Sequence, residues 1–353
     1  MLAVLKAIVC GTIFGQSYMN ALKMVNDIEL VGIFSHGSER SKKCARQYGV
    51  PLYTDIENIP KNIDIAFVII KSSVLGGIGT ELSKHLLTRG IYVMQEHPVN
   101  YKEVEECYKI AKKNNINYRI GNLYNSLESV SKFIRSSYYL NKTDKLEYVD
   151  VLSSSQGLYT LMSILSESLP KFRNLNMVSN NQEKRYPFNA FIMTNGDIDV
   201  DFRVHNEVSD IDGNNHMHLL HKITFFYESG RLELEDTFGS VIWRSRMDIA
   251  DSLIFEEGKK DINTDKLMNL KIFDEKEISF SLLISDVFSK AIEKEIEFFL
   301  EEIKSLKTNI SNVQKEILVS KKWSLITEEI GFPKAITFKG NYLDHANNLR
   351  RIR

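Results

Sequence analysis

The feature that most constrains this chain is an apolar strand that runs into a glycine turn, which opens a helix. The strand covers residues 2–9, and the turn follows in residues 9–16, V-C-G-T-I-F-G-Q. Such a turn points backbone N–H groups and a helix N-terminus at a phosphate group. We therefore expect this turn to bind the pyrophosphate of a dinucleotide, through Gly11, Thr12, Phe14, Gly15 and Gln16.

Further apolar runs alternate with helical patterns up to about residue 121. The predicted strands are residues 28–35, 63–70, 91–95 and 117–121. A helix is predicted after the turn, with Tyr18, Ala21, Leu22 and Val25 on one face, and further helices between Ser38 and Gly49 and over residues 81–89 and 102–114. Ser38 is expected to cap the second helix and Gly49 to end it. This alternation predicts a parallel, doubly wound sheet, whose strand-end loops gather at one edge, where ligands bind.

After residue 122 the pattern changes to helices at 127–140 and 157–169 and a series of short strands. The predicted strands are residues 147–153, 188–193, 198–204, 219–227, 231–235 and 240–243, with hairpin turns at 195–197 and 229–230. Helical patterns follow at 278–308 and 309–325. The predicted fold is α/β: a Rossmann domain over residues 1–122, then an α+β domain over residues 123–353 with an open, largely antiparallel sheet.

Composition excludes several classes of protein. With 353 residues the chain is long enough for two domains. A net charge of −1 gives no basic field for nucleic acid or for an anionic membrane. Three widely spaced cysteines predict no disulfide framework, and no apolar stretch reaches the roughly 20 residues of a membrane span. Since the N-terminal run lacks a basic leader, we expect a cytoplasmic protein.

The end of the second strand distinguishes between the two nicotinamide dinucleotides. An NAD enzyme usually places an acid there to accept from the ribose 2′-hydroxyl. Here residues 35–41 read S-H-G-S-E-R-S, and Glu39 lies inside the helix start. We expect a 2′-phosphate, and therefore NADP, to be bound through Ser35, Gly37, Ser38, Arg40 and Ser41. The alternative is a solvated helix cap in which Arg40 touches only water.

A second polar loop, residues 71–79, follows the third apolar strand and includes Ser72 and three glycines. Because it belongs to the same sheet edge, we expect Ser72 to lie against the cofactor. The alternative is a flexible turn into the next helix.

The next strand ends in Gln95-Glu96-His97-Pro98. At this point the chain resembles the Gfo/Idh/MocA oxidoreductases, which carry Glu-Lys-Pro here, often with a cis peptide before the proline. His97 stands where the family has its lysine. This departure argues against the usual sugar or polyol dehydrogenase, in which the lysine helps to move a hydroxyl proton.

Four sequence segments together resemble those of the thiazolinyl imine reductases of siderophore biosynthesis, as in the yersiniabactin and pyochelin pathways. They are V-C-G-T-I-F-G-Q, G-S-E-R-S, G-V-P-L-Y-T-D and Q-E-H-P. The similarity is dense over about the first 135 residues, extends through 122–124, and is weak at 239–243. It implies NADPH-dependent reduction of a thiazoline C=N to a thiazolidine, on an intermediate tethered to a carrier protein of a non-ribosomal peptide synthetase.

Reducing C=N requires a hydride at carbon and a proton at nitrogen. The nicotinamide supplies the hydride, and a side-chain acid supplies the proton. His97 and Tyr124 are the candidates, because each follows a strand at the expected nicotinamide edge. The resemblance implies Tyr124 as the general acid with His97 as its partner, whereas the spacing does not rank them. Glu96 and His97 are also expected to contact the cofactor.

Each of these catalytic interpretations has a purely structural alternative. Tyr124 is then a packing residue at the domain junction, and His97 a histidine whose hydrogen bonds are satisfied beside the proline.

Two other functions remain possible from the sequence. One is an NAD(P)-dependent dehydrogenase of a free sugar or small molecule, and the other is a non-catalytic NADP-binding sensor or scaffold. The partners expected with an imine reductase are a carrier-protein domain of the synthetase and a second copy of the chain, because an open antiparallel sheet commonly pairs with its copy.

Three features are discounted as functional signals. His216 and His218 are expected to share a strand face while His221 points the other way. Since no acid or cysteine completes the set, we predict no metal site there and prefer a role at the strand start or facing substrate. Charged residues between Lys290 and Lys315 are expected to form a solvated helix face. Trp243 is more simply core than the lining of a heteroaromatic pocket.

Overall fold

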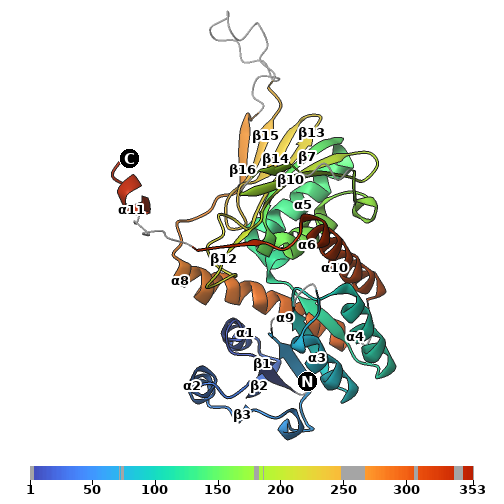
Figure 1. Cartoon of the computed structure of the whole chain (residues 1–353), viewed down its shortest axis with the longest axis vertical. Helices are drawn as coiled ribbons and strands as arrows, with labels where there is room; N and C mark the ends of the chain where they lie inside the picture. Colours follow the sequence, from blue (N-terminus) through green and yellow to red (C-terminus); the bar gives the residue numbers. More distant parts are fainter. Residues whose placement is uncertain are drawn as a thin grey trace, which may run out of the picture.

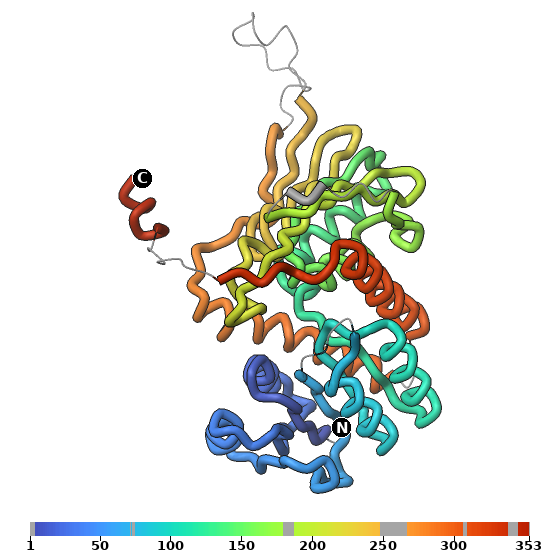
Figure 2. Tube along the Cα trace, viewed as in Figure 1, coloured from blue at the N-terminus to red at the C-terminus, as the bar shows by residue number. Residues whose placement is uncertain are grey.

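The computed structural model describes residues 4–70, 72, 75–178, 183–185, 187–247, 267–305, 309–337 and 345–352. Figures 1 and 2 show a smaller sheet at the N-terminal end of the molecule and a larger one at the other end, with the long helix α9 (Ser289–Lys304) crossing between them. Within the described residues, no helix combines the length and the apolar character needed to cross a membrane.

The smaller sheet has six parallel strands in the order β3-β2-β1-β4-β5-β6. The strands are β1 (Leu5–Cys10), β2 (Ile28–Phe34), β3 (Leu52–Tyr53), β4 (Ile65–Val68), β5 (Tyr92–Glu96) and β6 (Tyr118–Gly121), and the helices are α1 (Gly15–Leu22), α2 (Glu39–Tyr48), α3 (Ile78–Thr88) and α4 (Tyr101–Lys113). β4 is buried along its whole length, as its unbroken apolar run requires. The prediction of a Rossmann sheet is confirmed.

The expected helix signals are present in this part. The Ser38 side chain accepts from the N–H of Ser41 at the start of α2. Gly49 ends the same helix in the left-handed conformation, with φ 67°. Helix α1 ends at Leu22, so Val25, predicted on the same helix face, lies beyond the helix.

The larger sheet has the order β16-β15-β14-β13-β7-β11-β10-β8, with β9 paired to β10. Its strands are β7 (Leu146–Ser154), β8 (Asn176–Met177), β9 (Glu183–Arg185), β10 (Phe188–Thr194), β11 (Asp199–His205), β13 (His221–Tyr227), β14 (Gly230–Leu234), β15 (Val241–Ser245) and β16 (Asn269–Phe273). Every pairing is antiparallel except β7 with β11. The helices α5 (Glu128–Thr143) and α6 (Leu158–Ser168) pack against this sheet, so the predicted α+β architecture is confirmed.

Several short strands have no sequence signal. β8 and β9 have two and three residues, and so do not show a period-2 pattern. β12 (Glu207–Ser209) and β17 (Lys334–Ile336) pair only with each other. By contrast, the turn at 195–197 joins β10 to β11 as predicted, with Gly196 at φ 95°.

The strand expected from residue 219, with His216 and His218 on one face, is wrong in its first part. Strand β13 begins at His221, and the chain before it is a loop in which His216 has φ 69°. Trp243 is half-buried and packs on Tyr227, with ring centroids 6.3 Å apart.

The helix predicted over residues 278–308 is a composite. It begins as α8 (Phe280–Leu282), continues as the π-helical segment η5 (Leu283–Phe288) and ends as α9 (Ser289–Lys304). Residues 306–308 lie outside the described residues. The last long helix, α10 (Ile310–Ile330), is longer than predicted, and a short α11 (His345–Leu349) follows.

The solvated face expected between Lys290 and Lys315 is wrong for Glu295, which is 5% exposed. Glu295 Oε2 lies 3.4 Å from Arg119 Nη2 on the edge strand β6, and Glu302 Oε1 lies 3.1 Å from Arg119 Nη1. From α10, Glu316 accepts from the backbone N–H of Ile120, at 3.1 Å. The C-terminal helices therefore cover the open edge of the parallel sheet and pair with the Arg119 guanidinium and the Ile120 N–H.

All six strands of the parallel sheet lie within residues 5–121. The division at residue 122 stays a prediction, because α9 and α10 belong to the later part of the chain and yet pack on α1 and α4 of the earlier part.

Substituting Arg119 with leucine leaves two carboxylates without their cation at a largely buried site. We expect R119L to lower the free energy of unfolding by about 3–5 kcal/mol, measured by urea denaturation. The matched control is R203L, because Arg203 pairs with Asp150 at a half-exposed position and its loss is expected to change stability by less than about 1 kcal/mol. Equal losses in the two variants would contradict a structural role for the Arg119 pairs.

Candidate active site

The glycine turn has the geometry that its sequence predicts. Gly11 follows β1 at φ +102°, and a Cβ there would lie 2.3 Å from the carbonyl oxygen of Ile69. Glycine is therefore required at this position. Helix α1 begins at Gly15 with no side-chain cap, so its first N–H groups remain available to a phosphate.

The other residues predicted for the pyrophosphate differ in their surroundings. Thr12 is buried, with its hydroxyl 3.3 Å from that of Ser41. Gln16 Nε2 donates to the carbonyl of Thr12 at 3.0 Å and so braces the turn. The Phe14 ring packs edge-on against Phe288 of η5, at 6.0 Å, which connects the turn to the C-terminal helix.

A cluster of hydroxyl groups closes the end of β2. Ser41 is fully buried, and its hydroxyl lies 2.8 Å from those of both Ser35 and Ser38. Ser41 therefore organises the cluster, whereas Ser35 and Ser38 lie nearer the surface. Gly37 permits the tight bend between them, with φ 78°.

Arg40 is exposed in the first turn of α2 and has no hydrogen bond or ion pair within the described part of the chain. The neighbouring acid, Glu39, is engaged by Lys42 at 2.8 Å. The end of β2 thus presents hydroxyls, a helix N-terminus and an unpaired guanidinium.

Ser72 is 4% exposed, and its hydroxyl has no hydrogen-bond partner among the described residues. Its neighbours 71, 73 and 74 lie outside the described residues. The start of α3 beyond it is held by Glu103 of α4, which accepts from the Gly77 N–H at 3.3 Å and from the Thr80 hydroxyl at 2.7 Å. Sequence reasoning missed Glu103, because nothing local connects it to this loop.

His97 lies just after β5, and the peptide bond before Pro98 is cis, as the resemblance implied. Its Nδ1 lies 2.9 Å from the carbonyl oxygen of Gly121. A carbonyl only accepts, so Nδ1 carries the ring proton and Nε2 is an unprotonated acceptor. Burial lowers the pKa of His97 to about 4, so the ring is neutral at pH 7.

The Glu96 carboxyl group contacts both His97 and Tyr18. One carboxyl oxygen lies 3.2 Å from His97 Nδ1, and the other accepts from the Tyr18 hydroxyl. Burial raises the pKa of Glu96 to about 8, against the lowering effect of the Tyr18 hydrogen bond, and Glu295 raises it further. A Cβ on Gly121 would lie 2.7 Å from the Tyr18 oxygen, so this arrangement also depends on a glycine at the end of β6.

Tyr124 lies in the 3₁₀ turn η2 (Leu123–Ser126), and its backbone N–H donates to the Asn122 side chain at 3.2 Å. Its ring meets His97 edge-to-face, with centroids 5.8 Å apart. Its hydroxyl has no hydrogen-bond partner among the residues that the structure describes. Burial raises the pKa of Tyr124 above its ordinary value, so the phenol keeps its proton. The structure therefore brings the two predicted catalytic side chains together.

Two further aromatic groups enclose this pair. Tyr159 of α6 stacks on His97, with centroids 5.3 Å apart and planes 12° apart, and His221 meets Tyr124 edge-to-face at 5.8 Å. His221 is fully buried at the start of β13, and burial lowers its pKa to about 4. Sequence reasoning missed Tyr159 and Tyr18 as parts of the site, because both look like ordinary helix core.

His221 donates from Nε2 to the Gly157 carbonyl at 2.9 Å, while its Nδ1 lies 2.9 Å from the Thr237 hydroxyl. Both nitrogens are therefore used internally. His216 and His218 are exposed in the preceding loop. In the described ranges, no three His, Cys, Asp or Glu residues are placed to hold a metal ion.

A strand, glycine turn and helix of the dinucleotide-binding type, with His97 and Tyr124 in contact at neighbouring strand ends, is the arrangement expected of a nicotinamide-dependent oxidoreductase. Residues 5–122 match the model of the oxidoreductase family with an NAD-binding Rossmann fold (GFO/IDH/MocA), and residues 144–244 match the C-terminal domain of thiazolinyl imine reductase, Irp3-like. The chain is an oxidoreductase with an NAD(P)-binding Rossmann domain and an Irp3-like C-terminal domain. No curated protein matches it.

Solved structures share the fold at low sequence identity. A dehydrogenase (MviM) from Clostridium difficile is 12% identical with a TM-score of 0.63, over 92% of this chain and 99% of that one. KijD10, a 3-ketoreductase from Actinomadura kijaniata in complex with NADP, is 12% identical with a TM-score of 0.65, over 95% and 99%. GenD2 from gentamicin A biosynthesis, in complex with NAD, is 8% identical with a TM-score of 0.64, over 92% and 93%.

The protonation of His97 is open to direct measurement. We expect ¹⁵N NMR to find a neutral ring protonated at Nδ1 from pH 8 down to about pH 5, where an ordinary imidazole is already charged. Because the folded pKa is depressed, the stability that His97 contributes is present above about pH 6.5 and is lost as the pH falls toward 4. As the pH falls from about 6.5 toward 4, the free energy of unfolding of H97Q should therefore decrease by less than that of the wild type. A charged His97 at pH 6 would contradict this assignment.

Proposed function

We propose that this chain is an NADPH-dependent imine reductase that converts a thiazoline C=N to a thiazolidine on an intermediate tethered to a non-ribosomal peptide synthetase carrier protein. Support comes from the Irp3-like match over residues 144–244 and from the chemistry of the His97–Tyr124 pair. The observation that carries the proposal is the Tyr124 hydroxyl, which is protonated and has no partner among the described residues.

The residues present fit an NADP molecule. The N–H groups at the start of α1 would hold the pyrophosphate. The Gly11 N–H donates to the Phe34 carbonyl at 2.9 Å, so Gly11 contributes the close turn that brings the chain to the phosphate. Ser35, Ser38 and Arg40 would hold the 2′-phosphate, because hydroxyls and a free guanidinium face the end of β2 while Glu39 is engaged by Lys42. When bound, the nicotinamide supplies the hydride.

The protonation states favour Tyr124 over His97 as the proton donor. His97 Nε2 carries no proton, since Nδ1 donates to Gly121 and the ring is neutral. Tyr124 has a proton to give. When the hydride reaches the C=N carbon, the nitrogen gains an electron pair and becomes far more basic than a phenolate, so it takes the Tyr124 proton. Water then restores the phenol, and the His97 ring, which packs edge-to-face on Tyr124, positions the donor.

The second candidate is a dehydrogenase of a free sugar. That reaction needs a base to take a hydroxyl proton, and a lysine is absent from position 97. Burial lowers the pKa of His97 to about 4, which makes it a weak base near neutral pH. Reduction of an imine requires no such base.

Exposed apolar side chains at the ligand edge support presentation of the substrate by a carrier domain. Ile13 in the glycine turn is 74% exposed, Leu75 in the loop after β4 is 85% exposed, and Ile78 at the start of α3 is 69% exposed. Exposed apolar side chains that lie together are more typical of a surface that binds another protein than of a site for a free polar sugar. We also propose a homodimer through the outer face of the larger sheet, where Ile192 and Phe226 are exposed.

The decisive assay follows NADPH absorbance with a thioester-mimic thiazoline as acceptor, and separately with ketosugars. We expect oxidation of NADPH only with the thiazoline. A flat trace with the thiazoline and turnover with a sugar would replace the proposal by the second candidate. Flat traces with every acceptor, together with tight NADPH binding, would instead indicate a sensor or scaffold.

Removing the Tyr124 hydroxyl tests its role as the acid. We expect Y124F to lower turnover on the order of 10²-fold or more, with the dissociation constant of NADPH unchanged. Y148F is the matched control, since the Tyr148 hydroxyl bonds Asp201 on the larger sheet. Full activity of Y124F would return the proton-donor role to His97.

The choice of nucleotide is tested at Arg40. We expect R40A to weaken NADPH binding by at least tenfold and to leave NADH binding nearly unchanged, because only NADPH carries the 2′-phosphate. R46A, in the last turn of the same helix, should affect neither nucleotide. Equal losses for NADPH and NADH in R40A would remove Arg40 from the phosphate site.

A further inference from the structure

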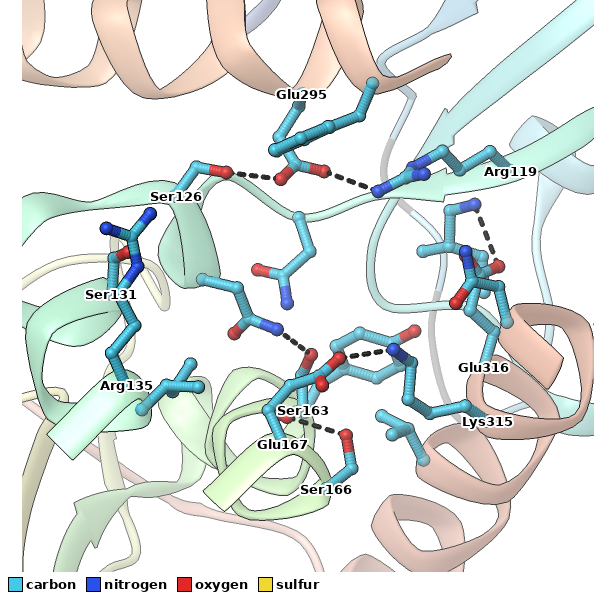
Figure 3. A pocket seen from close by; sticks show the side chains of 18 residues that line it. Arg119, Ser126, Ser131, Arg135, Ser163, Ser166, Glu167, Glu295, Lys315 and Glu316 are labelled. Atoms are coloured by element: carbon cyan, nitrogen blue, oxygen red, sulfur yellow. Dashed lines mark hydrogen bonds and ion pairs between the residues drawn. The ribbon is translucent and has the colours of Figure 1, made fainter. Parts of the chain in front are cut away.

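A separate cavity of about 260 Å³ lies where β6, η2, α5, α6, α9 and α10 meet (Figure 3). Two of its lining residues also belong to the surroundings of the catalytic pair. Tyr159 stacks on His97, and Asn122 accepts from the backbone N–H of Tyr124. Neither Tyr124 nor His97 lines the cavity. It is thus a compartment behind the reaction site, not part of it.

Most charges in this cavity are already paired. Arg119 contacts Glu295, whose other oxygen accepts from the Ser126 hydroxyl at 2.5 Å. Lys315 of α10 pairs with Glu167 of α6. Figure 3 shows both ion pairs spanning elements that are far apart in the chain. These groups close the cavity walls and leave little net charge for an occupant.

Other polar groups of the cavity have no partner. Asn122 Nδ2, a donor, and Asn125 Oδ1, an acceptor, are buried and make no hydrogen bond in the described chain. Such atoms are destabilising unless a water or a ligand satisfies them. Asn125 has its amide nitrogen bonded to Ser163, at 2.9 Å, so its oxygen is oriented by the protein and available to a donor.

The remaining cation lies at the mouth. Arg135 of α5 is exposed and forms no ion pair or hydrogen bond with any described residue, and Ser131 lies one turn before it. Figure 3 places the two side chains on the same side of the pocket. A guanidinium in this position matches a carboxylate, which it binds through two parallel hydrogen bonds.

We propose that this cavity binds a compact carboxylic acid that also carries a hydroxyl or ammonium donor. The carboxylate pairs with Arg135, a second acceptor atom of the ligand meets Asn122 Nδ2, and the donor meets Asn125 Oδ1. The volume is that of roughly nine water molecules in the liquid, which suits a molecule of about that many non-hydrogen atoms. Because Asn122 caps the turn that carries Tyr124, an occupant also holds that turn in place.

Two matched series of probes test the proposal by isothermal titration calorimetry of the full-length protein without nucleotide. The first is L-lactate, L-alanine and propionate, and the second is L-malate, L-aspartate and succinate. In each series the last acid lacks the donor. We expect saturable binding of at least one hydroxy or amino acid, at least tenfold tighter than the acid without the donor.

Variants then locate the binding. R135Q should weaken it at least tenfold, whereas K132Q, an exposed cation on the same helix, should leave it unchanged. Y124F should also bind normally, which separates this site from the proposed reaction. Absence of saturable binding in both series, or equal binding by wild type and R135Q, would overturn the proposal. The result does not depend on imine reduction, because no NADPH or thiazoline is used.

Discussion

The hydrogen bond from His97 Nδ1 to the Gly121 carbonyl is the interaction on which the site depends. It connects the ends of two adjacent parallel strands, and it fixes which ring nitrogen is protonated. Burial then keeps the ring neutral. Once these conditions hold, Nε2 of His97 carries no proton, and in the proposed reaction the neighbouring phenol is therefore the proton source. A backbone carbonyl therefore fixes which ring nitrogen of His97 carries the proton, which the sequence alone leaves open.

Glycine residues set the spacing around this interaction. At Gly121 a side chain would collide with the Tyr18 hydroxyl, which bonds Glu96, and Glu96 in turn contacts His97. At Gly11 a side chain would collide with the chain after β4. Both positions bring backbones or hydroxyls closer than any Cβ permits, one in the glycine turn and one beside the His97–Tyr124 pair.

Much of the fold follows from hydrophobic periodicity, because long buried strands and amphipathic helices repeat with distinct periods. The sequence also identifies the glycine turn, the Ser38 cap and the proximity of His97 to Tyr124, since each depends on strand ends meeting at one edge. It does not reveal Glu103, Tyr159 or the Arg119–Glu295 pair, whose partners lie far along the chain and show no local pattern. It also mistakes Glu295 for a solvated residue, because a buried acid looks like any other until its cation is placed beside it.

The two helices that cover the edge strand β6, α9 and α10, are synthesised long after that strand. The groups that satisfy this edge, Glu295 and Glu316, are synthesised more than 170 residues after Arg119 and Ile120. On the ribosome, the parallel sheet therefore forms first with one edge open to other chains. Until α10 is synthesised, this edge is without the groups that cover it in the folded chain.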